Sequence, residues 1–131
     1  METIPASHRD LLEAQFATLA TVGANGRPQQ SIVWFLAEGD NIRISLNSSR
    51  QKTINIERNP ACSVLIVDPA SNYRYVELRG TAKVEPDPEY VFADKVGAKY
   101  NSDLRVHDNP GDTRLVVTIV PDRVRALDMR S

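Results

Sequence analysis

FATLATVGANGRPQQSIVWFLAEGDNIRISLN, residues 16–47, is the stretch that decides the fold. Three runs within it are rich in strand-forming residues and alternate between two faces: residues 16–22, 28–37 and 41–47. The dipeptides Asn25-Gly26 and Gly39-Asp40 separate these runs and are typical of tight turns. The spacing therefore predicts a meander of three antiparallel strands.

Further strands are predicted downstream of this meander. ACSVLIV, residues 61–67, is continuously apolar, which predicts a strand buried on both faces. Residues 73–84 predict a long strand that a bulge or sharp bend interrupts at Gly80. Its inward-facing residues are predicted to be Val76, Leu78, Ala82 and Val84. TRLVVTIV (113–120) and DRVRALDM (122–129) predict two more strands.

Three short helices are also predicted. Ser7 and Asp10 resemble a capping box at the start of a first helix. A second helix follows Ser48 or Ser49 as its cap and ends near Asn59, because Pro60 disfavours helical geometry before it. The third begins at Asp87-Pro88-Glu89. Its apolar stripe (Phe92, Val96 and Tyr100) is interpreted as packing over a barrel end rather than as a ligand site.

The simplest architecture for these elements is a small, mainly β barrel with six to seven mostly antiparallel strands and about three short helices. Its 131 residues predict one domain, residues 1–131. A net charge of −1 excludes broad electrostatic binding to nucleic acid, and no apolar stretch predicts a membrane anchor. The single cysteine, Cys62, and a polar N-terminus predict a cytoplasmic protein without a signal peptide. The histidine and cysteine spacing does not predict a metal site.

The segment NSSRQKTINIERNP, residues 47–60, is the best candidate for a ligand site. The start of a helix exposes backbone N–H groups and a partial positive charge, and here Arg50, Lys52 and Thr53 add two cations and a hydroxyl. Such a combination suits a single phosphate group. A solvated helix whose cations pair with Glu57 or surface acids fits the same pattern, so both interpretations stay open.

The ordered set of segments resembles the flavin-reductase-like split β-barrel superfamily, to which pyridoxamine 5′-phosphate oxidase belongs. PASHRDLLE, RQKTINIERNPACSVLIVDP, DPEYVFADKVGAKY and PDRVRAL are most similar to its actinobacterial branch of deazaflavin (coenzyme F420)-dependent oxidoreductases. The resemblance covers nearly the whole chain. Pyridoxamine phosphate oxidases of this fold carry a C-terminal arginine-rich segment that this sequence lacks, so oxidation of vitamin B6 is not expected.

The resemblance implies a homodimer with two cofactor sites in clefts between the subunits. It implies that Arg50, Lys52 and Thr53 bind the cofactor phosphate. The residues implied to lie along the rest of the cofactor are Ser45, Leu46 and Asn47 beside the linking chain, and Gln29, Ser31, Ile32 and Val33 at the ring. Tyr73, Arg74 and Tyr75 are implied to approach from the partner subunit. Trp34 is interpreted as core or interface packing.

The function implied is hydride transfer from reduced coenzyme F420 to a small electron-poor acceptor such as a quinone, an enone or a conjugated tetrapyrrole. The cofactor would carry the chemistry, and no dedicated acid/base pair stands out in the sequence, so the proton source stays open between solvent, the Tyr73 hydroxyl and no specific group. Two alternatives remain at this point. One is an oxidase or reductase that binds FMN, whose phosphate suits the same basic pocket, and the other is a non-catalytic carrier of F420.

Overall fold

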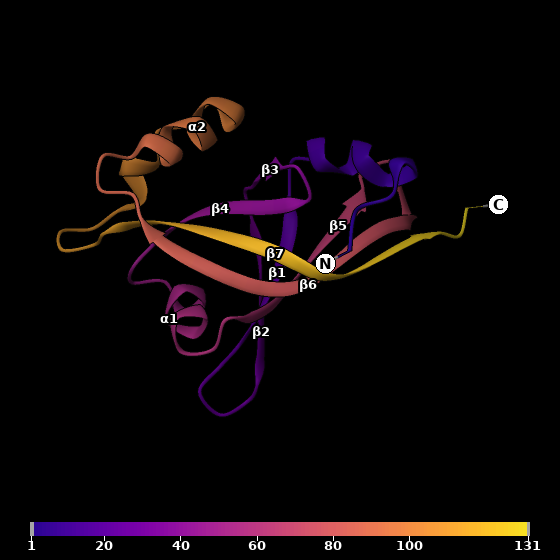
Figure 1. The fold of residues 1–131 in the computed structure, drawn as a ribbon. Coiled ribbons are helices and arrows are strands. Elements are labelled where there is room, and N and C mark those ends of the chain that lie inside the picture. Colours follow the sequence, from indigo (N-terminus) through magenta and orange to yellow (C-terminus); the bar gives the residue numbers. More distant parts are fainter. Residues whose placement is uncertain (1, 131) are drawn as a thin grey trace.

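The computed structural model describes residues 2–130, and within that range the chain forms seven strands and four short helical segments (Figure 1). The strands are β1 (Ala17–Val22), β2 (Pro28–Val33), β3 (Leu36–Glu38), β4 (Asn41–Asn47), β5 (Ala61–Asp68), β6 (Ser71–Pro86) and β7 (Arg114–Asp128). The helical segments are the 3-10 helices η1 (Ala6–Glu13) and η2 (Leu104–His107) and the α-helices α1 (Gln51–Arg58) and α2 (Val91–Tyr100). All strand pairs are antiparallel, which confirms the predicted mainly β architecture. Within residues 2–130, none of the helices is long and apolar enough to cross a membrane.

The strands form one sheet in the order β2-β1-β5-β6-β7-β4-β3. Its two outermost strands, β2 and β3, are joined only by Trp34 and Phe35, so the sheet must curl until its edges approach each other. The result is a split barrel, because these two edge strands do not pair with each other. The predicted three-strand meander is confirmed in part, since β1 pairs with β2 and the end of the predicted second strand pairs with β4 as β3. It is wrong in that residues 28–37 form two strands, and the other neighbour of β4 is β7.

Phe35 is where the chain crosses from one edge of the sheet to the other. Its side chain is fully buried, so its backbone polar groups need partners other than water. The backbone N–H donates to the hydroxyl of Tyr100 at 3.0 Å. The carbonyl accepts hydrogen bonds from the same hydroxyl at 3.2 Å and from the ammonium of Lys99 at 2.9 Å. Side chains of α2 thus replace the sheet partners that the chain loses at the crossing.

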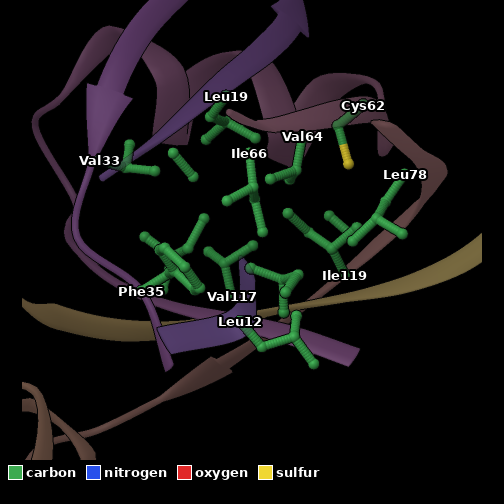
Figure 2. Close-up of a cluster of buried hydrophobic side chains, with 14 of the residues drawn as sticks. Leu12, Leu19, Val33, Phe35, Cys62, Val64, Ile66, Leu78, Val117 and Ile119 are labelled. Atoms are coloured by element: carbon green, nitrogen blue, oxygen red, sulfur yellow. The ribbon is translucent and has the colours of Figure 1, made fainter. Parts of the chain in front are cut away.

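The core fills the inside of the curled sheet (Figure 2). Side chains from β1, β2, β5, β6 and β7 converge there, among them Leu19, Val33, Val64, Ile66, Leu78, Val117 and Ile119. On β6, Val76, Leu78 and Ala82 are buried and Val84 packs against the core, which confirms their predicted inward direction. The prediction for residues 61–67 is wrong for the single chain, since only alternate residues of β5 are buried and Val67 is exposed.

The long strands β6 and β7 pair along nearly their whole length, so residues 114–128 form one strand where two were predicted. The register shifts between Arg79 and Gly80, which confirms the predicted irregularity. At that point Gly80 pairs with Pro121. A Cβ atom on Gly80 would lie 2.1 Å from the carbonyl oxygen of Val120, so the β7 backbone approaches too closely for any side chain.

The first two helices differ from the prediction at their starts. The N-terminal segment is a 3-10 helix without a side-chain cap, and Asp10 instead bonds to Arg74 on β6. Helix α1 ends at Arg58, with Asn59 as its C-cap before Pro60, as predicted. Its N-cap is Arg50 rather than a serine, and no side chain caps it. The anticipated serine cap is therefore wrong.

The third helix begins later than predicted, at Val91, after Tyr90 in a left-handed conformation. Asp87 still caps it, because its carboxylate accepts hydrogen bonds from the backbone N–H groups of Phe92 (3.3 Å) and Ala93 (3.0 Å). In Figure 1, α2 and α1 lie on opposite sides of the strands β4 and β7. The predicted stripe on α2 does pack over the barrel, in a cluster with Leu104 and Val116.

Replacing Gly80 tests the close approach of β6 and β7. We expect Gly80→Ala to lower the free energy of unfolding by about 3 kcal/mol, because the added methyl group collides with backbone that cannot rotate away. Urea denaturation measures the change. Gly26→Asn is the control, since Gly26 has a φ of 80° and open space around it, and asparagine tolerates that conformation. Equal losses for both variants would contradict the steric explanation.

Candidate functional site

A cleft of about 230 Å³ lies where the barrel is split, and we call it the seam cleft. One wall is the end of β2, and the opposite wall is the end of β4 with the start of β7. The start of α1, one turn of α2 and the segment η2 complete it. Its lining residues are Ile32, Val33, Trp34, Ile44, Ser45, Leu46, Asn47, Arg50, Lys52, Val96, Leu104, His107 and Arg114.

Two cations stand at the α1 end of the seam cleft. Lys52 is only 7% exposed, although it carries an ammonium group, and Arg50 is exposed. Within residues 2–130, neither forms an ion pair with a carboxylate, whereas nine other ion pairs are formed there. Burial, and then the positive charge of Arg50, lower the pKa of Lys52. A buried lysine without a counterion is costly for a fold, which indicates that an anionic ligand belongs beside it.

The start of α1 is fixed in position by buried hydrogen bonds. Thr53 donates its hydroxyl to the carbonyl of Asn47 at 2.8 Å, which holds the first turn against the end of β4. Asn55 donates to the hydroxyl of Thr21 on β1 at 3.1 Å and accepts from Gln51 at 2.8 Å. With no side-chain cap on α1, its first backbone N–H groups remain available for a ligand.

On the other side of the cleft, a buried polar network surrounds Asp108. Its carboxylate forms an ion pair with the guanidinium of Arg114, and both side chains are more than nine-tenths buried. It also accepts hydrogen bonds from Tyr90 and, at 3.1 Å, from the side-chain amide of Asn47. Burial alone would raise the pKa of Asp108, but these hydrogen bonds outweigh it and hold the pKa below its usual value. The charge of Arg114 is therefore balanced within the protein, unlike the charges of Arg50 and Lys52.

Aromatic side chains form the remaining wall. Trp34 stacks on Tyr100 with ring centroids 4.5 Å apart and planes inclined by 3°. His107 meets Trp34 edge-to-face, with centroids 6.3 Å apart. Trp34 thus packs against α2, as interpreted from the sequence, but it also lines the cleft.

The structure brings together seven of the predicted cofactor-binding residues. Those that line the seam cleft are Ile32, Val33, Ser45, Leu46, Asn47, Arg50 and Lys52. Two of these side chains are partly engaged within the protein, since the amide of Asn47 donates to Asp108 and the hydroxyl of Ser45 accepts from Arg114 at 3.4 Å. Their contact with a cofactor stays a prediction.

The other predicted residues lie outside the cleft lining of the single chain. Gln29 accepts a hydrogen bond from Thr21 at 3.0 Å, and Thr53 is fully buried in its bond to Asn47. Ser31 places a buried hydroxyl next to the Ile32–Val33 wall, and this hydroxyl has no partner within residues 2–130. These three residues belong to β2 and α1, which contribute walls of the cleft, but none of the three lines it.

Tyr73, Arg74 and Tyr75 of β6, which were predicted to approach the site from a partner subunit, differ in their exposure to solvent. Tyr73 is 60% exposed, and Tyr75 is half-buried on the outer face of the sheet. Arg74 is buried, and its guanidinium bonds to Asp10, to Asp68 and to the carbonyl of Ser7. Through these hydrogen bonds Arg74 holds η1 and the β5–β6 turn of its own chain together.

Sequence reasoning missed Ile44, Val96, Leu104, His107 and Arg114 as lining residues. Arg114 enters the cleft because β7 pairs with β4, where Asn47 lies opposite it, and this pairing is non-local. His107 comes from the segment predicted as a polar loop. A histidine in a polar loop was the only available signal, and it is a weak one.

Comparisons with known proteins agree with the split-barrel fold. Residues 4–128 match the family model described as pyridoxamine 5′-phosphate oxidase, and the chain belongs to this family. A solved structure named F420 reductase is 33% identical, with a TM-score of 0.81, over 93% of this chain and 98% of that chain. Group A Streptococcus HupZ is 25% identical, with a TM-score of 0.74, over 98% and 97% of the two chains. A conserved hypothetical protein from Mycobacterium tuberculosis, 24% identical with a TM-score of 0.79 over 99% and 88%, shares the fold.

Replacing Asp108 tests the network that supports the cleft. We expect Asp108→Asn to lower the free energy of unfolding by about 3 kcal/mol at neutral pH, because Arg114 keeps a buried charge without a counterion. The folded-state pKa of Asp108 is depressed, so this contribution is complete above the usual pKa of about 4. It is lost as the pH falls through the lower folded-state value.

Urea denaturation of both proteins between pH 7 and acidic pH measures this difference. The matched control is Asp94→Asn, which breaks an exposed pair with Arg105 and should change stability little. A stability difference between Asp108→Asn and the unmodified protein that stays constant as the pH falls would contradict the assigned role.

Proposed function

We propose that this protein is a reductase that binds reduced coenzyme F420 in the seam cleft and transfers a hydride to a small electron-poor acceptor such as a quinone or an enone. The observation that carries the proposal is the state of Lys52. This residue is buried, lines the cleft and has no carboxylate partner in residues 2–130. The likeness to the structure named F420 reductase favours this cofactor over FMN.

The residues present fit a phosphorylated tricyclic cofactor. Arg50, Lys52 and the uncapped start of α1 supply cationic and N–H donors for a phosphate group. Ile32, Val33 and Trp34 supply an apolar and aromatic wall for a flat ring. The buried hydroxyl of Ser31, which lacks a partner in residues 2–130, lies next to that wall.

When bound, the reduced deazaflavin supplies a hydride from its C5 position. The chain's own residues bind and orient the cofactor and keep water away from it. Arg50 and Lys52 hold the phosphate end, and the Asp108–Arg114 pair keeps the opposite wall in place. Val96 and Leu104 cover the cleft with apolar surface.

A homodimer is part of this proposal. The outer face of β1, β2 and β5 carries an apolar groove of about 380 Å³, with Ile32 64% exposed and Phe16 57% exposed. Exposed apolar residues gathered in this way are typical of an interface. Ile32 lines both this groove and the seam cleft, so a second copy on this face would extend the cofactor site. The seam cleft alone is smaller than the ~300–1,000 Å³ of most ligand sites, which supports completion by a partner.

Titration of the purified protein with F420 and with FMN, followed by fluorescence, tests the choice of cofactor. Tighter binding of F420, together with oxidation of reduced F420 by a quinone or enone above the rate without protein, is the expected result. Preference for FMN would contradict the proposed cofactor. Tight F420 binding with no oxidation of the reduced cofactor by any acceptor in the panel would contradict the proposed catalysis and indicate a carrier.

Lys52→Met tests the phosphate site. We expect affinity for F420 to fall about 10- to 100-fold, because a charge-assisted hydrogen bond contributes about 1.5–3 kcal/mol. We also expect the cofactor-free variant to be at least as stable as the unmodified protein, since the substitution removes a buried, uncompensated charge. The control is Lys95→Met, which removes an exposed lysine of α2. Lower stability with unchanged affinity would contradict the assignment.

Phe16→Glu tests the homodimer. A carboxylate in the apolar groove should prevent association and make the protein monomeric at micromolar concentration in analytical ultracentrifugation. Affinity for F420 should fall with it, although Phe16 does not line the seam cleft. The matched control is Val91→Glu, at an equally exposed apolar position on α2. A Phe16→Glu protein that remains dimeric would contradict the proposed interface.

A further inference from the structure

His107 is the imidazole that lines the seam cleft. We propose that it is a catalytic residue: the proton donor to the acceptor that is reduced there. The inference rests on the proposed reductase function and adds to it, because the hydride supplied by a cofactor leaves an acceptor that still needs a proton. The sequence contains only one other histidine, His8.

The placement of His107 suits both release and recovery of a proton. Its ring lies beside Trp34, on the aromatic wall, and the residue is exposed to solvent. Within residues 2–130 the ring forms no hydrogen bond, so both nitrogens are available. His8 contrasts with it, because that residue is buried and bonds through one nitrogen to Ser7 and through the other to the carbonyl of Leu127.

The backbone of His107 is held in place by hydrogen bonds, although its ring forms none within residues 2–130. Its carbonyl accepts a hydrogen bond from the amide of Asn47 at 3.4 Å, and the next residue is Asp108 of the buried network. At the other end of η2, Asp103 accepts from the backbone N–H of Arg105 at 3.1 Å. A donor needs such support to stay in reach of one atom of its substrate.

Other lining groups are poorly suited to donate a proton near neutral pH. Guanidinium groups in proteins do not give up a proton, and the charge of Arg114 is paired with Asp108. Lys52 lies at the α1 end of the cleft, beside Arg50. Imidazole is the side chain that exchanges its proton most readily in this pH range.

The charged groups around His107 come from three elements. Asp108 follows it, Arg114 faces the cleft from β7, and Arg50 and Lys52 face it from the start of α1. Arg105 on η2 is paired with Asp94 and Asp103. A bound anion would neutralise the cations at the start of α1 and so lower the positive charge around the cleft.

Reduction of an enone takes up one hydride and one proton across its C=C bond. The β-carbon of the acceptor takes up a hydride, and the C=C electron pair moves to form an enolate. His107 moves its N–H proton to the α-carbon, and the neutral imidazole regains a proton from water. The enone becomes a saturated ketone, while the cofactor is oxidised by two electrons and releases its remaining proton to water.

Nuclear magnetic resonance of the two imidazoles in the unmodified protein gives a test without turnover. 2-Methylcyclohex-2-enone is added to the protein saturated with oxidised F420, which cannot reduce it. We expect the His107 resonances to shift and the His8 resonances to stay in place. Unchanged His107 resonances at an enone concentration that saturates turnover would overturn the inference.

His107→Gln gives the second test. We expect unchanged affinity for F420 and a rate of enone reduction about 100-fold lower, because general acid catalysis contributes about 10²–10⁴-fold. The dependence of the rate on pH should also change, because glutamine carries no titratable group at this position. The new stereocentre at the α-carbon should also be formed with less facial selectivity, which a purely structural role would not change. The control is Val106→Ala, at the neighbouring exposed residue of η2.

The outcomes separate this inference from the proposed function. If the unmodified protein reduces the enone and His107→Gln keeps its rate, pH profile and selectivity, only the role of His107 is wrong. If the unmodified protein neither binds F420 nor reduces any acceptor, the proposed function fails and this inference fails with it.

Discussion

The crossing at Phe35 is the feature on which the rest of the structure depends. Two strands at opposite edges of the sheet are joined there by two residues, and Phe35, the second of them, is fully buried. The hydroxyl of Tyr100 and the ammonium of Lys99 form the hydrogen bonds that the backbone N–H and carbonyl of Phe35 would otherwise lack. The ammonium of Lys99 also lies 4.1 Å from the centre of the Phe35 ring. Because α2 supplies these partners, the barrel can remain open along one side, and that opening is the seam cleft.

Charge compensation divides the charged groups of the cleft into those with a partner in the protein and those without one in residues 2–130. Arg114 and Asp108 are both buried, but they neutralise each other and share their remaining hydrogen bonds with Tyr90 and Asn47. Lys52 is as buried as Arg114, yet it has no such partner within residues 2–130. A net charge of −1 for the whole chain hides this local excess. The cations that lack a counterion therefore indicate an anion site better than the total number of cations in the chain does.

Local patterns in the sequence predicted the local parts of the fold. Alternation located β1, β4 and β6, Pro60 marked the end of α1, and Gly80 marked the irregular pairing with β7. The pattern could not predict the break after Val33, because residues 28–37 are suited to a strand throughout and the break depends on α2, about 60 residues away. For the same reason the cations of α1 were identified, whereas Arg114 and His107 were not. These two reach the cleft only through the pairing of β4 with β7 and the bonds of η2 to Asn47.

The position of Ile32 has a thermodynamic consequence for the proposed dimer. This residue lines the seam cleft on one side of β2 and contributes to the apolar groove on the outer face. A cofactor that contacts both subunits in such a place must bind the dimer more tightly than the monomer. By linkage, the same free energy then strengthens association of the subunits when the cofactor is present. The uncompensated charge of Lys52 favours binding of the cofactor in monomer and dimer alike, since the cofactor phosphate would remove an electrostatic cost that the free protein bears in every copy. In the proposed dimer, cofactor binding and subunit association therefore form one linked equilibrium.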